Sequence, residues 1–498
     1  MTTTIDRGPS AQEIPSGRRG SHALRWWVLA VLGLAQLMVV LDATVVNIAL
    51  PEAQRDLGFD DASRQWVITG YALAFGSLLL LGGRLSDLFG RRNTFIIGLI
   101  GFSVASAIGG AAANFEMLVA ARIGQGVFGA ILAPAALSLL TVTFTEPSER
   151  AKAFGIFGAV AGTGGAIGLL LGGALTEWAS WRWVMFVNLA FAAVALVGAV
   201  LLLAKHVAGT RPRLDIPGTV VVTAALFGIV YGFSHAESNG WTDSVTLAFL
   251  LGGAALLGLF VWLETRVAHP LLPLRIVLDR TRGGAYLAVF VMGIGMFAIF
   301  LFLTYYMQLT LGYSPIMTGV AFLPMVAAMI ASSTTVPSLL LPKVGPKVVV
   351  SGGFAIAAVG MAWLTRIGLD TGYATHILPG LVLLGLGLGG AMSTAFQSAT
   401  AGVHHDDAGV ASAMINTSQQ VGGSIGTALL STIAASAASD YLGARTPNQL
   451  TVAQSAIESY TTSFTWAAGV FIVGAVVLGL LMPSTLPAPA EGEPVLAH

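Results

Sequence analysis

Two charged side chains lie inside long apolar runs, where a charge is costly. Asp42 falls in the run from Trp26 to Leu50, and Arg122 lies near the start of another such run. A charge at mid-bilayer depth costs roughly 2.5–3.5 kcal/mol on insertion scales, so it generally has a partner or a function. At 1.5 Å per residue, both charges lie roughly 10–12 Å below the same membrane surface. Their matched depth and opposite sign predict an ion pair, provided that the two spans adjoin.

The pair could do proton chemistry. Arg122 does not lose its proton in practice, so Asp42 is the member that titrates. Burial and a neighbouring guanidinium act in opposite directions on the proton affinity of a carboxyl group, which suits a proton carrier. A static ion pair that fixes the register of two helices is the alternative interpretation.

Composition defines the environment in which this pair works. Hydrophobic residues make up 55% of the 498 residues and charged residues 10%, and the mean hydropathy is +0.81. A soluble chain would carry about 25% charged residues, so the composition predicts a polytopic membrane protein. The net charge of zero gives no indication of nucleic-acid binding.

Apolar runs predict an all-α fold with fourteen transmembrane helices. A span needs about 20 mostly apolar residues. The approximate limits are 26–49, 66–83, 94–113, 116–140, 152–176, 183–204, 215–233, 245–263, 285–309, 316–340, 347–366, 377–398, 409–433 and 463–482. The segment between the last two spans is polar, and no regular structure is predicted for it.

Lysine and arginine in the connections set the orientation. With both termini inside, 18 of the 24 fall in inner segments and 5 in outer ones. Such an excess marks the cytoplasmic side, so we predict a multi-pass protein of the plasma (inner) membrane with cytoplasmic N- and C-termini.

Two similar basic turns indicate an internal repeat. Gly82 to Arg92 joins the second and third spans, and Pro342 to Lys347 joins the tenth and eleventh. Two six-helix bundles with a two-helix insert place these turns at equivalent positions, as in transporters with parallel repeats. The predicted organisation is a disordered cytoplasmic tail over 1–24, a six-helix bundle over 25–204, a linker with two inserted helices over 205–270, a second bundle over 271–484 and a cytoplasmic tail over 485–498.

Glycines gather on one face of the fifth span. At 100° per residue, they fall within about 140° of each other, with Leu169 in the middle of that face. They are Gly155, Gly158, Gly162, Gly165, Gly168, Gly172 and Gly173. Such a face lets another helix approach closely and slide. Ordinary packing of small residues without a gating role is the alternative.

The first basic turn is a candidate gate. Asp87 is the one acid among its arginines, and the glycines Gly83 and Gly90 frame it, with Arg91 and Arg92 following. These charges could make and break pairs as the two bundles rock. The alternative is plain positive charge on the inner side.

Polar and flexible side chains in the second half are candidates for a substrate cavity. Asn416 and Gln420 belong to a stripe that recurs every four residues, and Gln397 lies in the preceding span. Met296 and Phe300 add the flexible and aromatic surface that suits a promiscuous apolar site. The polar stripe could equally bond neighbouring helices, and the aromatic residues near the end of that span could form an interfacial belt.

Other chemistry is not indicated. The sequence has no cysteine and no phosphate-binding loop, which excludes thiol chemistry and gives no support to direct drive by ATP. The run His404 to Asp407 is interpreted as a solvated loop rather than a metal site. No cofactor is expected, and the chain is not predicted to be an enzyme.

The motifs together resemble the major facilitator superfamily, and within it the fourteen-span drug:proton antiporter branch (EmrB/QacA-like). Leu41 to Pro51 resembles the span-1 motif of that branch, and Leu118 to Ala130 resembles the span-4 motif linked to proton coupling. The turn from Gly82 to Arg92 resembles the signature loop of the superfamily. The glycines Gly155, Gly164, Gly168, Gly172 and Gly173 resemble the span-5 antiporter motif, in which Leu169 stands where the family has proline.

The resemblance implies a proton-coupled multidrug efflux antiporter that confers antibiotic resistance. Asp42 and Arg122 would couple to protons, and the span-5 glycines would serve the conformational change. The expected partners are protons, a lipophilic and sometimes cationic small molecule and the lipid bilayer, with no nucleic acid and with the monomer as the functional unit. The alternative is an exporter of one endogenous metabolite, lipid or self-made antibiotic, and a remote one is a membrane scaffold or receptor that transports nothing.

Overall fold

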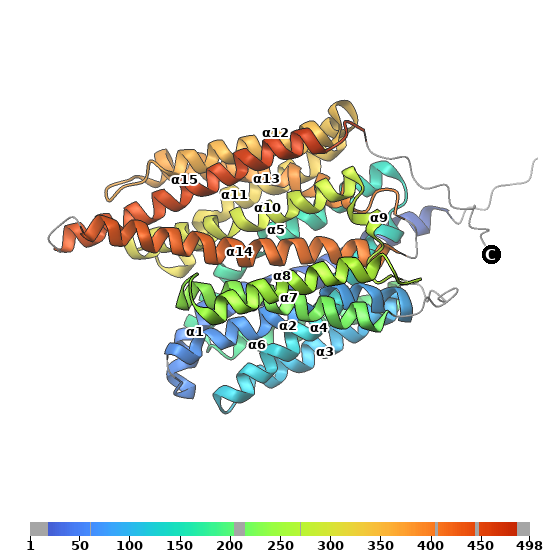
Figure 1. Cartoon of the computed structure of the whole chain (residues 1–498), viewed down its shortest axis with the longest axis horizontal. Helices are drawn as coiled ribbons and strands as arrows, with labels where there is room; N and C mark the ends of the chain where they lie inside the picture. The colour runs from blue at the N-terminus through green and yellow to red at the C-terminus, as the bar shows by residue number, and fades with distance from the viewer. Residues whose placement is uncertain are drawn as a thin grey trace, which may run out of the picture.

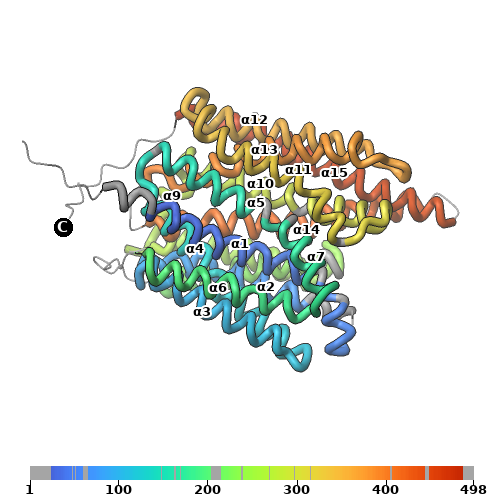
Figure 2. The backbone as a smooth tube through the Cα atoms, turned by 180° about the vertical axis from the view of Figure 1, so that it is seen from behind, coloured from blue at the N-terminus to red at the C-terminus, as the bar shows by residue number. Residues whose placement is uncertain are grey.

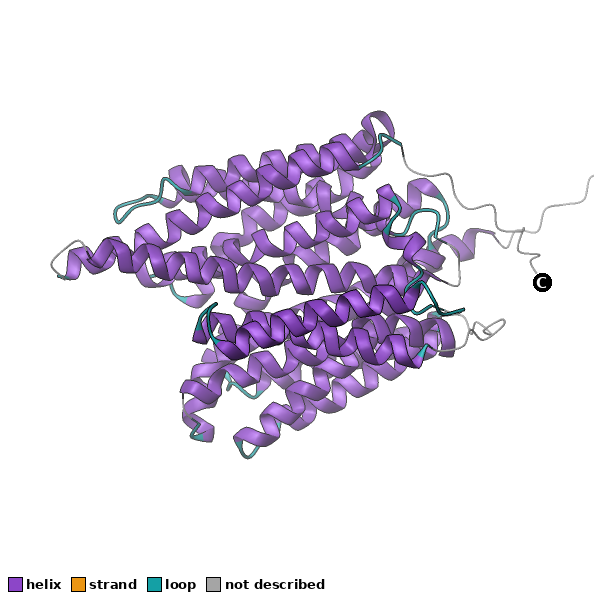
Figure 3. Cartoon of the chain, viewed as in Figure 1, coloured by secondary structure: helices purple, strands orange, loops and turns teal. Residues whose placement is uncertain are grey.

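The chain is a long bundle of helices (Figure 1). The computed structural model describes residues 18–59, 61–203, 215–268, 270–403, 407–443 and 448–485. Over these residues it contains helices and loops and no β-strand (Figure 3). The all-α prediction is therefore confirmed for the described part of the chain.

The helices follow the apolar runs but extend past them. Every α-helix except the four-residue α9 has 20 residues or more. Thirteen are long and apolar enough to cross a membrane, and α5 is not among those thirteen. The bounds are α1 Arg18–Leu57, α2 Asp61–Phe89, α3 Arg91–Gly110, α4 Phe115–Thr143, α5 Pro147–Trp178, α6 Trp183–Leu202, α7 Ile216–Asn239, α8 Ser244–Glu264, α9 Leu274–Val277, α10 Arg280–Tyr305, α11 Pro315–Thr335, α12 Leu341–Leu364, α13 Leu378–Ala399, α14 Ala408–Gly443 and α15 Gln449–Leu481. Short π-helical segments cover Tyr306–Thr310, Val336–Leu340 and Tyr373–Ile377.

Local sequence explains where several helices begin. Asn114 accepts a hydrogen bond from the backbone of Met117 at 2.9 Å, and Asp243 and Asp279 cap α8 and α10 in the same way. Such side chains satisfy the free N–H groups of a first helical turn. Asn448 and Thr451 form a reciprocal capping box at the start of α15.

Four sequence predictions about loops need correction. The predicted turn from Gly82 to Arg92 is helical up to Phe89, and the chain bends only at Gly90, whose φ of 86° suits glycine. The second basic turn bends likewise at Gly345, with a φ of 75°. The first helix starts at Arg18, inside the predicted tail. The polar segment before the last span is mostly helix, because α14 and α15 continue beyond their apolar runs and pack against each other.

The helices form two groups, with α7 and α8 between them (Figure 1). The first group contains α1 to α6, and the second contains α9 to α15. In Figures 1 and 2, α3 and α6 lie along one long side of the molecule and α12 lies along the other. α5 leaves the first group to pack against α11 and α13, while α14 leaves the second to pack against α2, α4 and α7. Helix α1 begins, and helix α15 ends, at the end of the molecule where α9 lies (Figure 1). We call this end the α9 end. The predicted domain limits and the side on which the termini lie stay predictions.

Candidate functional site

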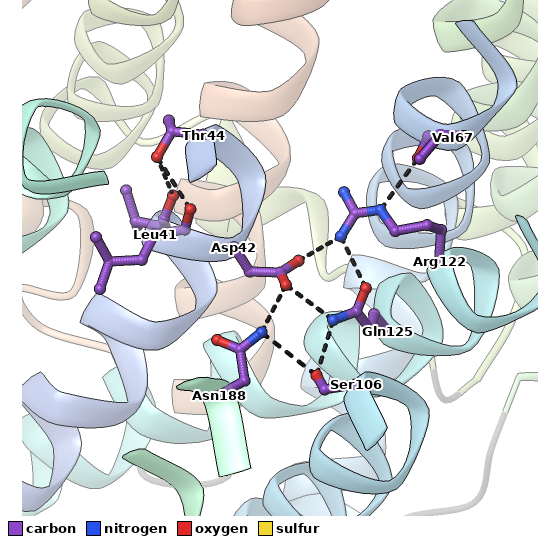
Figure 4. A network of polar contacts seen from close by, with 9 residues as sticks. Leu41, Asp42, Thr44, Val67, Ser106, Arg122, Gln125 and Asn188 are labelled. Carbon is purple, nitrogen blue, oxygen red and sulfur yellow. Dashed lines mark hydrogen bonds and ion pairs between the residues drawn. The ribbon is translucent and has the colours of Figure 1, made fainter. Parts of the chain in front are cut away.

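The two intramembrane charges meet inside the first group of helices (Figure 4). Arg122 on α4 donates from Nη1 to Oδ2 of Asp42 on α1 at 2.5 Å. Each residue is only 1% exposed. The antiparallel arrangement of α1 and α4 brings their matched depths together, as the sequence predicts.

Three neighbouring side chains complete the site. Gln125, one turn after Arg122, donates to Oδ1 of Asp42 at 2.8 Å, and Asn188 on α6 donates to the same oxygen at 2.7 Å. The Ser106 hydroxyl on α3 accepts from Gln125 at 2.8 Å and from Asn188 at 3.4 Å. The network around Asp42 thus links four helices, α1, α3, α4 and α6.

The arginine has partners of its own. Its Nε donates to the carbonyl oxygen of Val67 at 3.0 Å, and Nη1 also reaches Oε1 of Gln125 at 2.7 Å. The guanidinium carbon lies 4.4 Å from the centre of the Tyr71 ring, within the range of a cation–π contact. Arg122 therefore stays anchored to α2 and α4 whatever the state of Asp42.

The donors of the network also bond acceptors other than Asp42. Each donor that bonds Asp42 has a second acceptor outside α1: Gln125 for Arg122, and Ser106 for both amides. A buried donor left without an acceptor costs about 1–3 kcal/mol. Each of these donor nitrogens therefore has one acceptor that does not depend on Asp42.

Helix α1 contacts α5 on a different side. Thr44 lies two residues after Asp42, which on a helix is about 200° around the axis. Its hydroxyl bonds the carbonyl oxygens of Val40 and Leu41 in its own helix, and a Cβ added at Gly168 of α5 would overlap it. A Cβ at Gly164 would meet Val40 at 2.5 Å, and one at Gly172 would meet Val45 at 3.1 Å. Because these contacts are so close, a movement of α1 would change its packing against α5 directly.

The glycines of α5 serve two neighbours rather than one. Gly155, Gly158 and Gly165 face the second group: a Cβ at Gly155 would overlap the Ser333 carbonyl oxygen of α11, and one at Gly165 would lie 3.2 Å from Phe300 of α10. The single approach face predicted from the helical wheel is thus divided between α1 and the helices α10, α11 and α13. Gly173 is buried in α5, and the side chain of Leu169 lies outside the described part of the structure.

Replacement of Gly168 by valine is expected to lower the transport rate by at least about ten-fold, because overpacking of a tight contact costs about 1–3 kcal/mol and separates α1 from α5. Gly469→Val on α15 is the matched control, since a Cβ there meets nothing within 4 Å. Efflux rates normalised to membrane protein level measure the effect. Thr44→Ala should partly restore Gly168→Ala, and equal losses in Gly168→Val and Gly469→Val would contradict the close-contact interpretation.

The candidate gate lies at the α9 end between the two groups. Oδ1 of Asp87 accepts the backbone N–H of Gly409 on α14 at 3.1 Å and lies 3.7 Å from Arg91. A Cβ at Gly83 would lie 2.6 Å from the Gly409 carbonyl oxygen, so α2 and α14 are in backbone contact there. Arg92 instead donates to Val200 of α6 at 3.2 Å. Gly83 and Asp87 therefore contact the second group, whereas Arg91 lies beside Asp87 within the first group and Arg92 bonds α6.

The five candidates for a substrate cavity have different neighbours, and their common role in binding substrate stays a prediction. Met296 lines a cavity of about 20 Å3 with other methionines, which is large enough for one water molecule and too small for a drug-sized ligand. Phe300 lies at the α5 contact, and Gln420 lies 3.0 Å from the position of a Cβ at Gly76 of α2. Asn416 donates to the Ser412 carbonyl oxygen of its own helix. Gln397 is buried, and its amide nitrogen has no hydrogen-bond partner among the described residues.

Sequence reasoning missed Asn188 and Ser106. Asn188 is a single amide in an otherwise apolar run, and that isolation was a usable signal of an intramembrane partner. Ser106 gave no signal, because serines are ordinary residues in membrane helices. Residues 404–406 of the His404 to Asp407 run lie outside the described residues. Asp407 bonds Arg275 at 2.5 Å, and the described residues contain no group that could hold a metal ion.

Taken together, two packed groups of long apolar helices, the first of which encloses a buried charge network, define an integral membrane protein. The family model described as Major Facilitator Superfamily matches residues 32–427, and the chain belongs to that family. The resemblance inferred from the motifs is therefore confirmed.

Similar proteins include exporters and resistance proteins. The chain is 48% identical to the puromycin resistance protein pur8 of Streptomyces alboniger over 97% of both chains. It is 39% identical to the cephamycin export protein CmcT of Amycolatopsis lactamdurans, over 85% of this chain and 88% of that one. Its fold is like that of the human organic anion transporter MFSD10, with a TM-score of 0.63, 14% identity, and coverage of 91% of this chain and 99% of the other.

Proposed function

We propose that this protein is a proton-coupled antiporter that exports lipophilic small molecules, cationic ones among them, across the plasma membrane. The observation that carries the proposal is the buried Asp42 carboxylate, the one acid in a network of amide and guanidinium donors that all have second acceptors. Such a group can gain and lose a proton while its surroundings stay satisfied. No cofactor is required, because the proton gradient supplies the energy.

The proposed mechanism links the proton to the substrate through α1. With Asp42 ionised, its bonds to Arg122, Gln125 and Asn188 hold α1 against α4 and α6. Protonation from the outer side weakens these bonds, and α1 shifts against the glycines of α5. Because α5 also packs on α10, α11 and α13, that shift changes the contact between the two groups of helices. Release of the proton on the inner side restores the first arrangement.

In this mechanism substrate and proton influence each other at a distance. Asp42 faces the interior of the first group, whereas Thr44 on the same helix faces α5. A substrate bound between the two groups would therefore favour one position of α1, and with it one protonation state of Asp42. Such coupling between two sites is reciprocal in binding free energy.

A second candidate is export of a single antibiotic. The names of the relatives favour it, since pur8 is a puromycin resistance protein and a 34% identical relative from Streptomyces glaucescens is a tetracenomycin C resistance and export protein. Both candidates use the same fold and the same proton site. They differ in how many unrelated molecules the chain protects against.

Growth protection in a drug-sensitive host distinguishes the two candidates. We expect the wild-type chain to raise the tolerated concentration of several unrelated lipophilic compounds, including ethidium and puromycin, and Asp42→Asn to raise none. Protection against one compound alone would support the second candidate. Protection that Asp42→Asn retains in full would contradict the proton-coupled function.

A further inference from the structure

Two buried carboxyl groups face each other at the open end of the α7–α8 hairpin, far in the sequence from Asp42. Asp215 immediately precedes α7, and Glu264 is the last residue of α8. Each is 5% exposed, so both are removed from water. Neither residue is part of the network around Asp42.

One oxygen of each carboxyl group has a defined structural task. Oδ1 of Asp215 accepts the N–H of Gly218 at 3.0 Å and caps α7. Oε2 of Glu264 accepts the N–H of Leu272 at 3.0 Å and thereby ties the segment before α9 to the hairpin. These bonds fix the orientation of both groups.

The other two oxygens lie beside the same glycine, Gly218, and accept no hydrogen bond among the described residues. Oδ2 of Asp215 and Oε1 of Glu264 are buried and lack a hydrogen-bond partner among the described residues. Both converge on Gly218: a Cβ added there would overlap Oδ2 and lie 2.9 Å from Oε1. A hydrogen on either oxygen would join the two groups in a hydrogen bond.

The surroundings do not favour two negative charges. The pair adjoins an apolar cluster of Leu80, Val222, Leu226, Phe260, Leu271, Leu272, Val410 and Ala413. Among the described residues, the basic side chains on the neighbouring elements have other contacts: Arg275 bonds Asp407, and Arg266 lies over the Trp262 ring. On α2, Arg84 and Asp87 show no bond to either carboxyl group in the described residues. Two like charges this close in a dry site cannot both stay ionised at low cost.

We propose that Asp215 and Glu264 form a second proton-binding site, in which Oδ2 of Asp215 and Oε1 of Glu264 share one proton. The shared proton links the open end of the α7–α8 hairpin and thereby steadies the segment before α9, which Glu264 bonds. The occupant is a proton rather than a metal ion, because two carboxyl groups offer too few ligands for a cation cage. This link holds Leu271 and Leu272 against α2 and α14, beside Gly409, where the two groups of helices meet. Its role does not depend on the proposed transport mechanism.

The sign of the pH dependence follows from linkage. The native state keeps a proton on this pair that the unfolded chain would release at neutral pH, so native stability falls as pH rises. Glu264→Gln replaces the shared proton with an amide that donates to Oδ2 of Asp215. Asp215→Asn does the same from the other side and keeps the cap on α7 through its carbonyl oxygen.

Infrared spectroscopy of the purified full chain tests the site directly. In an Asp42→Asn background, we expect the carbonyl band of a protonated carboxyl group at neutral pH, and its loss in either Glu264→Gln or Asp215→Asn. Glu116→Gln is the matched control, because Glu116 is exposed at the start of α4. A band that is unchanged in both variants would overturn the proposal.

Thermal unfolding gives a second readout. Between about pH 6 and about pH 9, we expect the melting temperature of the wild type and of Glu116→Gln to fall by about 2 °C more than that of Glu264→Gln or Asp215→Asn. Equal pH dependence in all four proteins contradicts a shared proton. A wild-type melting temperature that rises with sodium or potassium concentration, and not with acidity, would assign the site to a cation and also overturn it.

Discussion

Asp42→Asn is expected to abolish uphill efflux driven by a pH gradient, with a loss of at least about ten-fold in initial rate. Asparagine has nearly the same shape as a protonated aspartate and cannot release a proton, so α1 would stay in the arrangement of the protonated state. The measurement is substrate accumulation in inverted membrane vesicles with an imposed pH gradient.

The same variant should keep one activity. Exchange of labelled for unlabelled substrate needs no net proton movement, so Asp42→Asn should retain it. Asp370→Asn, which changes an exposed acid, is the control and should transport like the wild type. Loss of exchange together with uphill efflux would show that Asp42 serves folding or binding and not proton coupling.

Arg122→Leu is expected to have the largest effect on stability. Removal of one partner of a buried ion pair leaves an uncompensated charge and costs about 3–5 kcal/mol. The bonds of Arg122 to Val67 and to the Tyr71 ring would be lost as well. The free energy of unfolding in mixed detergent micelles measures the effect, and Arg366→Leu, at an exposed position, should cost less than about 1 kcal/mol.

A double-mutant cycle separates the charge from the packing. If the cost comes from the unpaired Asp42 carboxylate, Asp42→Asn should recover most of the stability that Arg122→Leu loses. If the two changes simply add, the residues are not coupled and the ion pair has no special role. The recovered variant should still fail to move substrate uphill, because it has no titratable group at this site.

The sequence predicted the features that depend on depth and composition. The apolar runs located the long helices, because each must cover the thickness of a bilayer. Opposite charges at equal depth predicted the contact of Asp42 with Arg122. The motifs predicted the family, which the family model confirms.

Features that depend on the packing of particular helices could not be predicted from the sequence as well. Asn188 reaches Asp42 only because α6 packs beside α1, and no sequence pattern sets that neighbour. The division of the α5 glycines between two partners follows from the position of α5 between the two groups. Gly83 and Gly409 were not predicted to be in contact, because they belong to different halves of the chain.

The two faces of α1 connect these results. One face carries Asp42 into a network that involves α3, α4 and α6, and another carries Thr44 onto the glycines of α5. A change in proton occupancy on the first face therefore changes the fit on the second. Under this account, Leu169 in place of the family proline leaves the close contacts of Gly164, Gly168 and Gly172 with α1 in place.

Proton movement in reconstituted vesicles tests the central claim most directly. Purified protein would be placed in liposomes that contain a pH-sensitive dye, and an outward gradient of a transported lipophilic cation would be imposed. The account predicts proton flow in the direction opposite to the substrate with the wild type, and no proton flow with Asp42→Asn. Substrate movement without proton flow in the wild type, or equal proton flow in the two proteins, would contradict it.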